Sequence, residues 1–88
     1  MKNKIESLRK KLIELEALMG SFSMKLLLQR ILFELGREDI EIPDSIQNFP
    51  LDAFSQKELD QFIQLLATTV SSILGEDFEK EIKKTWNE

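Results

Sequence analysis

The sequence predicts an all-α protein, a small helical bundle of three main helices plus a short C-terminal helix, with a long irregular segment between the second and third helices. Three observations lead to this fold class. Large apolar residues recur at spacings of three and four along most of the chain, which is the periodicity of amphipathic helices. The three glycines stand where this periodicity stops, and both prolines fall between residues 37 and 54. With 42% hydrophobic and 32% charged residues, residues 1–88 are expected to form one globular domain.

The first helix is predicted over residues 1–19, because its apolar residues form a heptad-like seam. Their spacings alternate between three and four, and the residues are Ile5, Leu8, Leu12, Leu15, Met19 and Phe22. Two interpretations stay open: the seam packs only on its own domain, or it also pairs with a second copy of the chain or with a partner helix. On the second interpretation, a homodimer is held by an oligomer contact that comprises Ile5, Leu8, Leu12, Leu15, Met19 and Leu28.

Gly20 and the serines after it predict a turn, with Ser21 or Ser23 capping the second helix. The alternative is one long bent helix that continues to Leu35. Between residues 24 and 35 the only polar side chains are Lys25, Gln29, Arg30 and Glu34. A helix this apolar has to be covered on most of its sides. We therefore expect it at the centre of the bundle or of a dimer core.

Residues 37–54 form the predicted irregular segment, since Pro43 disfavours a helical conformation at the residue before it. One short helical turn fits between Asp44 and Asn48, and Pro50 is expected to exclude another before the third helix. Such a long connection is unusual in a small domain. Its large apolar residues are Ile40, Ile42, Ile46, Phe49, Leu51 and Phe54. We expect a lid pinned across the bundle, which either only covers the core or doubles as a recognition surface.

The third helix is predicted to begin after Ser55, because Ser55 and Glu58 fit a capping box, in which each side chain satisfies a backbone N–H. Gly75 ends the helix. The predicted apolar face comprises Leu59, Phe62, Ile63, Leu66, Val70, Ile73 and Leu74. The other side of this helix either is exposed or lets another backbone approach closely, because its residues are small: Ala67, Thr68, Ser71 and Ser72.

A last helix is predicted from Glu76 to about Lys84, with acids at its N-terminus and lysines near its C-terminus, as the helix dipole favours. Phe78, Ile82 and Trp86 mark one side of it. Trp86 is the only tryptophan. It either docks on the bundle or anchors a partner, because tryptophan is enriched among binding hot spots.

The chain contains no histidine, cysteine or tyrosine, so the usual general base, soft metal ligand and thiol nucleophile are missing. We therefore expect neither an enzyme nor a cofactor. The acids Asp39, Glu41 and Asp44 suggest a calcium loop only superficially. An EF-hand loop that starts at Asp39 needs glycine at its sixth position, where this chain has Asp44.

Charge is unevenly distributed along the chain. Residues 1–37 carry eight basic and four acidic side chains, whereas residues 38–88 carry four and twelve. A basic stripe on the first helix comprises Lys2, Lys4, Arg9, Lys10 and Lys11. The isoelectric point near 4.9 nevertheless argues against nucleic-acid binding. No signal peptide or membrane-spanning apolar run is apparent, so we expect no membrane contact and a cytoplasmic location.

These patterns favour a non-catalytic protein–protein interaction module, a small acidic adaptor or regulator that self-associates. The first alternative is a transcription-linked regulator that contacts RNA polymerase or DNA, and the more distant one is an enzyme subunit. Acidic and apolar side chains together would attract and hold a basic partner protein. The predicted partner-binding residues are Glu38, Asp39, Glu41, Ile42, Phe49 and Trp86.

Overall fold

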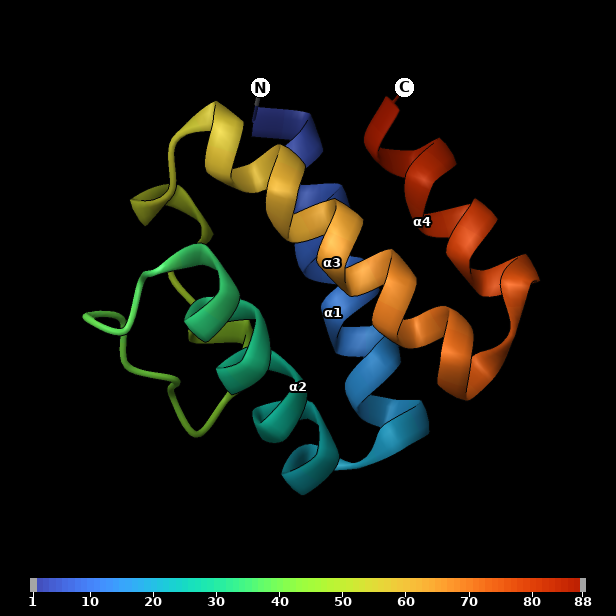
Figure 1. Ribbon diagram of the computed structural model, residues 1–88, viewed down its shortest axis with the longest axis horizontal. Helices are drawn as coiled ribbons and strands as arrows, with labels where there is room; N and C mark the ends of the chain where they lie inside the picture. Colours follow the sequence, from blue (N-terminus) through green and yellow to red (C-terminus); the bar gives the residue numbers. More distant parts are fainter. Residues whose placement is uncertain (1, 88) are drawn as a thin grey trace.

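The computed structural model describes residues 2–87 and contains four α-helices, which confirms the all-α fold class (Figure 1). Within these residues there is no β-strand. The elements are α1 (Lys2–Met19), α2 (Ser21–Leu35), the 3-10 turns η1 (Ile46–Asn48) and η2 (Leu51–Ala53), α3 (Gln56–Leu74) and α4 (Glu76–Asn87). No helix in this part of the chain has the length and apolar character needed to cross a membrane.

Gly20 separates α1 from α2, as the sequence predicted. Its φ of 90° and ψ of 156° lie where residues with a Cβ are strained, so the helix breaks at this glycine. The predicted serine cap is wrong, because Gly20 itself is the N-cap and Ser21 is already helical. No side chain caps α2. The carbonyl of Gly20 instead accepts a hydrogen bond from the N–H of Met24 at 3.0 Å.

Gly36 ends α2 in a left-handed conformation, with φ 71° and ψ 22°. The N–H of Gly36 donates to the carbonyl of Phe33 at 3.1 Å, and the N–H of Arg37 donates to that of Leu32 at 2.9 Å. This pair of bonds is a Schellman motif. It turns the chain out of α2 and sets the direction in which the irregular segment leaves.

The irregular segment is pinned to the bundle by its apolar residues. Ile46, Phe49, Leu51 and Phe54 are all buried, and the rings of Phe49, Phe54 and Phe62 lie about 6 Å apart. η1 forms where one helical turn was predicted. η2 was not predicted, and the expectation that Pro50 excludes a turn is wrong, because Pro50 precedes the turn with φ −80°. A proline before the first helical residue costs no hydrogen bond.

The capping box of α3 forms as predicted. The Ser55 hydroxyl accepts from the N–H of Glu58 at 3.2 Å, and a Glu58 carboxylate oxygen accepts from the N–H of Ser55 at 2.9 Å. Two predictions for α3 are corrected. Ala67 is fully buried in the core instead of lying on an exposed face, while Ile73 and Leu74 are exposed at the end of the helix.

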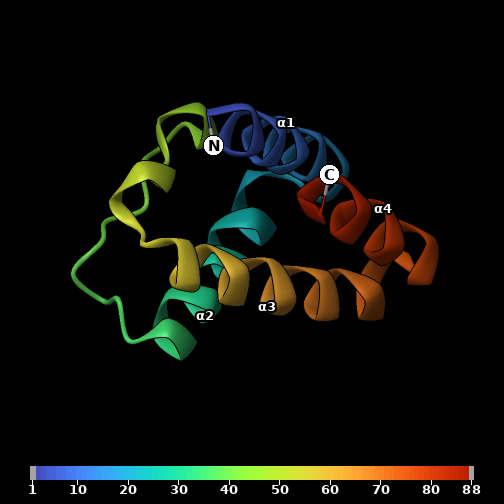
Figure 2. The same cartoon turned by 90° about the horizontal axis from the view of Figure 1, so that it is seen from above.

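α4 folds back after Gly75 and packs on both α3 and α1 (Figures 1 and 2). Trp86 docks in this layer and is buried. Its indole N–H donates to Asp60 at 2.8 Å, and the ammonium group of Lys4 lies 5.3 Å from the ring centroid. Of the two interpretations of Trp86, the structure places this residue in the domain's own core.

The heptad-like seam of α1 faces the inside of its own domain. Leu8, Leu12 and Leu15 are buried, as is Leu28 of α2, while Ile5 and Met19 pack against the same core. Within the single chain, the residues of the predicted oligomer contact therefore pack in or against the domain's own core. Phe22, which continued the seam in the sequence, belongs to α2 and is exposed.

α2 is less covered than its composition predicted. One side is buried by α1 and α3. The other side leaves three large apolar side chains in solvent: Phe22 is 75%, Leu26 is 50% and Phe33 is 67% exposed. The expectation that α2 is covered on most sides is therefore wrong for the single chain.

Candidate functional site

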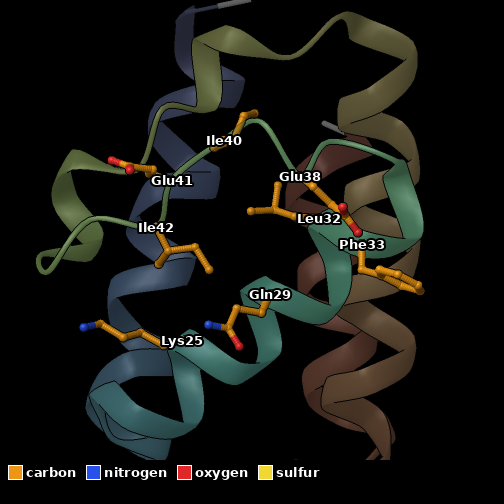
Figure 3. A pocket seen from close by; sticks show the side chains of 8 residues that line it. All are labelled: Lys25, Gln29, Leu32, Phe33, Glu38, Ile40, Glu41 and Ile42. Atoms are coloured by element: carbon orange, nitrogen blue, oxygen red, sulfur yellow. The ribbon is translucent and has the colours of Figure 1, made fainter.

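A groove of about 550 Å³ lies between α2 and residues 38–42 (Figure 3). Both walls come from segments that are adjacent in the sequence, because the Schellman turn at Gly36 folds the irregular segment back along α2. The lining residues from α2 are Lys25, Gln29, Leu32 and Phe33, and those from the irregular segment are Glu38, Ile40, Glu41 and Ile42.

The apolar part of the groove consists of Leu32, Ile40 and Ile42, with Phe33 at the edge. Leu32 is buried, whereas Ile40 and Ile42 are half-buried and pack against the core. Figure 3 shows Ile42 reaching toward Gln29, and Phe33 pointing away from the cavity on the α2 side. The groove thus has apolar walls and one large, exposed aromatic side chain on its rim.

The charged part of the groove is mainly acidic. Glu38 and Glu41 are exposed, and within residues 2–87 neither of them forms an ion pair. Lys25 is the only basic residue in the lining, and its ammonium group lies 3.3 Å from a carboxylate oxygen of Asp44. Because Lys25 has this partner, the two glutamates leave an uncompensated negative rim.

Arg37 fixes the start of the irregular segment. Its guanidinium donates to Asp39 at 3.1 Å and to Glu58 at 2.9 Å, and it lies 5.4 Å from the ring centroid of Phe54. The hydrogen bond from Arg37 lowers the pKa of Asp39. The pKa of Glu58 is also lowered, first by the backbone N–H of Ser55 and then by Arg37. The wall of the groove is thereby tied to the N-terminus of α3.

Arg9 holds the other end of this segment from α1. Its guanidinium donates to the carbonyl of Gln47 at 2.6 Å and to that of Phe49 at 2.9 Å. Two arginines and four buried apolar side chains therefore fix the residues on either side of the groove wall. The groove is part of the folded domain.

The predicted partner-binding residues fall into three groups. Glu38, Glu41 and Ile42 line the groove. Asp39 borders a neighbouring, more open hollow of about 560 Å³, which shares Ile40, Glu41 and Ile42 with the groove. Phe49 and Trp86 are buried in the core, so they are not available at the surface of the folded chain.

The α2 side of the groove was not predicted from the sequence. Gln29, Leu32 and Phe33 were treated as part of a helix that is covered on most sides. One signal was present, because Phe22, Leu26 and Phe33 lie at spacings of four and seven and so share one side of a helix. This side is opposite the buried residues Met24, Leu27, Leu28 and Ile31.

The basic stripe of α1 is largely used within the domain. Lys4 lies over Trp86, Arg9 binds two backbone carbonyls, and Lys11 binds Glu81 at 2.9 Å. The hydrogen bond that Lys11 donates to Glu81 is the main reason that the pKa of Lys11 is raised. Lys10 is exposed, and the side chain of Lys2 lies outside the described residues. These contacts reduce the cationic surface that the sequence suggested.

Among the described residues no group of three or more acidic side chains is arranged to hold a metal ion. The carboxyl groups with shifted pKa values are Asp39, Glu58 and Glu79, and all three are lowered by hydrogen bonds and ion pairs. No protein-family model, curated protein or solved structure matches this chain. The site is therefore interpreted from its own geometry and charge.

Proposed function

We propose that this protein is a non-catalytic protein-binding module, and that the groove between α2 and residues 38–42 is its contact surface. One observation carries the proposal: a partly apolar groove with unpaired carboxylates on one side and the exposed Phe33 on the other. Groups of exposed apolar side chains with polar borders are typical of interaction sites.

The chemistry of the groove supports a protein ligand. Ile40 and Ile42, which are half-buried, offer apolar surface that releases water when it is covered. Glu38 and Glu41 attract cationic groups and increase the rate of encounter with a basic partner. Phe33 is an aromatic side chain of the kind that commonly supplies a large share of binding energy.

The rigidity of the groove also supports this function. Arg37 and Arg9 fix the segment that forms one wall, and α2 forms the other. A site that is already formed loses less conformational entropy when it binds. The contact surface is therefore preorganised for its ligand.

Self-association stays a prediction. In the single chain, the residues expected to mediate it pack in the domain's own core. A cytoplasmic location also stays an expectation. No contact in the structure favours the alternative of a transcription-linked regulator over the binding module proposed here.

Site-specific crosslinking in the native cell tests the proposal. A photoreactive phenylalanine analogue replaces Phe33 in one variant and the exposed Ile73 in a matched control. We expect a protein to be crosslinked from position 33 and not from position 73. The crosslinked protein is then identified and purified, and its affinity is measured for the Phe33→Ser and Ile73→Ser variants.

We expect Phe33→Ser to weaken binding at least about fivefold, because truncating a hot-spot residue costs more than about 1 kcal/mol. Ile73→Ser should leave the affinity unchanged. Equal affinities of the two variants for the purified partner would exclude the groove as the contact surface. Circular dichroism confirms that both variants keep their helices.

A further inference from the structure

The apolar surface of the groove continues along the whole outer side of α2. Phe22, Leu26 and Phe33 form a stripe, and Gln29 lies between the last two on the same side. The stripe spans three helical turns, about 16 Å. Gln29 and Phe33 also line the groove (Figure 3), so the stripe and the groove form one surface, which we name the α2 face.

The α2 face fits a helix better than an extended peptide. Its apolar side chains are separated by four and seven residues, and a second helix with the same spacing can pack along them. An extended peptide that binds by strand addition needs a sheet edge, and residues 2–87 contain no β-strand with which it could pair. A helix satisfies its own backbone hydrogen bonds and brings only side chains to the surface.

The negative charges along one edge of the α2 face favour the binding of a cationic helix. Glu38 and Glu41 lie on the irregular segment beside α2, and neither forms an ion pair among the described residues. The one lysine of the groove is paired with Asp44. Lysine or arginine residues along one side of a bound helix would therefore meet unpaired carboxylates.

A second copy of this chain does not supply such a helix. Its most basic helix, α1, already uses Arg9 and Lys11 for internal contacts and buries its apolar seam. Its own α2 face carries the same acidic edge, and the chain has a net charge of −4. The surface therefore complements a different protein better than it complements itself.

We propose that the α2 face binds a cationic amphipathic helix of another protein. The apolar side of that helix lies on Phe22, Leu26 and Phe33, and its basic side faces Glu38 and Glu41. This inference rests on the proposed function and specifies the ligand of the same site.

Synthetic peptides test the proposal directly. The probe is a fluorescent peptide of about 16 residues, long enough for the stripe, with leucines at helical spacing and lysines on one flank. Two matched peptides carry either glutamates in place of the lysines or a central proline. We expect the lysine peptide to bind and to gain helicity by circular dichroism. The glutamate and proline peptides should bind at least about tenfold more weakly.

Protein variants locate the peptide on the α2 face. Leu26→Ser should weaken binding at least about fivefold, and Ile73→Ser, which changes another exposed apolar residue, should leave it unchanged. Glu41→Lys should weaken binding and reduce its salt dependence. Glu6→Lys makes the same change of charge at an exposed position on α1 and should have a smaller effect.

Several outcomes would overturn the proposal. They are failure of the lysine peptide to bind at millimolar concentration, equal binding of the proline peptide, or equal effects of Leu26→Ser and Ile73→Ser. A dimer in sedimentation experiments that Leu26→Ser dissociates would identify a second copy as the occupant instead. A partner that crosslinks at position 33 through an extended or acidic segment would also exclude this inference, while the proposed function would stand.

Discussion

Arg37 and Glu58 form an ion pair in which one guanidinium nitrogen lies 2.9 Å and 3.1 Å from the two carboxylate oxygens. Glu58 is also the acidic partner in the capping box of α3, where it accepts the N–H of Ser55. One carboxylate therefore joins the end of the α2 turn to the start of α3. Residues 38–42, the wall of the groove, follow directly from this junction.

Replacing Arg37 with alanine should loosen that wall. Arg37→Ala removes the hydrogen bonds to Asp39, Glu58 and the carbonyl of Ala53. We expect faster amide hydrogen exchange in residues 38–42 and a lower urea midpoint, measured by exchange mass spectrometry and circular dichroism. Arg30→Ala is the control, since Arg30 is exposed on α2 and none of the described hydrogen bonds uses its side chain. Unchanged exchange in Arg37→Ala would show that the apolar contacts alone fix the segment.

Stability should decrease in acid because of the same junction. The pKa values of Asp39 and Glu58 are lowered in the folded protein, so the unfolded chain binds more protons as the pH falls. The stability that these two carboxylates contribute is fully present at pH values above their ordinary pKa values. It is lost as the pH falls through their lowered pKa values, below about pH 4. We expect the urea midpoint to fall between about pH 5 and pH 3. The fall should be smaller in Glu58→Gln, and equal falls would contradict the role given to the pair.

Ser55→Ala should destabilise the protein by about 0.5–2 kcal/mol, because the N-cap hydroxyl satisfies the N–H of Glu58. Urea denaturation followed by circular dichroism measures this change. Ser23→Ala is the matched control: Ser23 is an exposed serine early in α2, and no side chain caps that helix. The control should change stability by less than about 0.5 kcal/mol.

Leu12→Ala should destabilise the monomer by about 2–5 kcal/mol, since Leu12 is fully buried and its truncation leaves a cavity. Leu18→Ala, on the same helix, should have an effect within about 0.5 kcal/mol, because Leu18 is 62% exposed. The free energy of unfolding, measured at several protein concentrations, shows whether the seam of α1 packs only within its own chain or also pairs with a second copy. If the stability of the parent protein rises with its concentration, the seam also forms contacts between chains.

Trp86→Ala should destabilise the fold by about 3–5 kcal/mol, the range for removing a large buried aromatic side chain. Trp86→Phe keeps a ring in place but removes the hydrogen bond to Asp60, so it should cost less. Thermal unfolding of both variants measures the difference. Small, equal effects would show that α4 contributes little to stability.

The local parts of the fold could be predicted from the sequence, because their causes are local. Gly20, Gly36 and Gly75 end helices, and Ser55 with Glu58 caps one. The parts that could not be predicted depend on distant neighbours. Arg9 binds carbonyls in the irregular segment, and nothing near Arg9 in the sequence indicates those acceptors.

For the site, the sequence predicted the acidic and apolar residues Glu38, Glu41 and Ile42 but not the helix beside them. Apolar periodicity identifies which residues share a side of a helix, and it does not say how many sides the rest of the chain covers. In α2 the composition favoured burial on most sides, and α1 and α3 cover only one. Phe49 was expected at the binding surface and is buried, and Trp86 takes the docked position that was one of its two interpretations. Aromatic side chains suit both a core and an interface.

The contact between Lys4 and Trp86 joins residues from nearly opposite ends of the chain. α3 and α4 are neighbours in the sequence and can pair early in folding. Packing α1 on α4 closes a loop of almost the whole chain and therefore costs more conformational entropy. Trp86 is the only tryptophan. Its fluorescence emission in a stopped-flow refolding experiment would therefore change when α1 packs on α4. A Lys4→Met variant, which removes the contact of the ammonium group with the ring, would distinguish the packing of α1 from the pairing of α3 with α4.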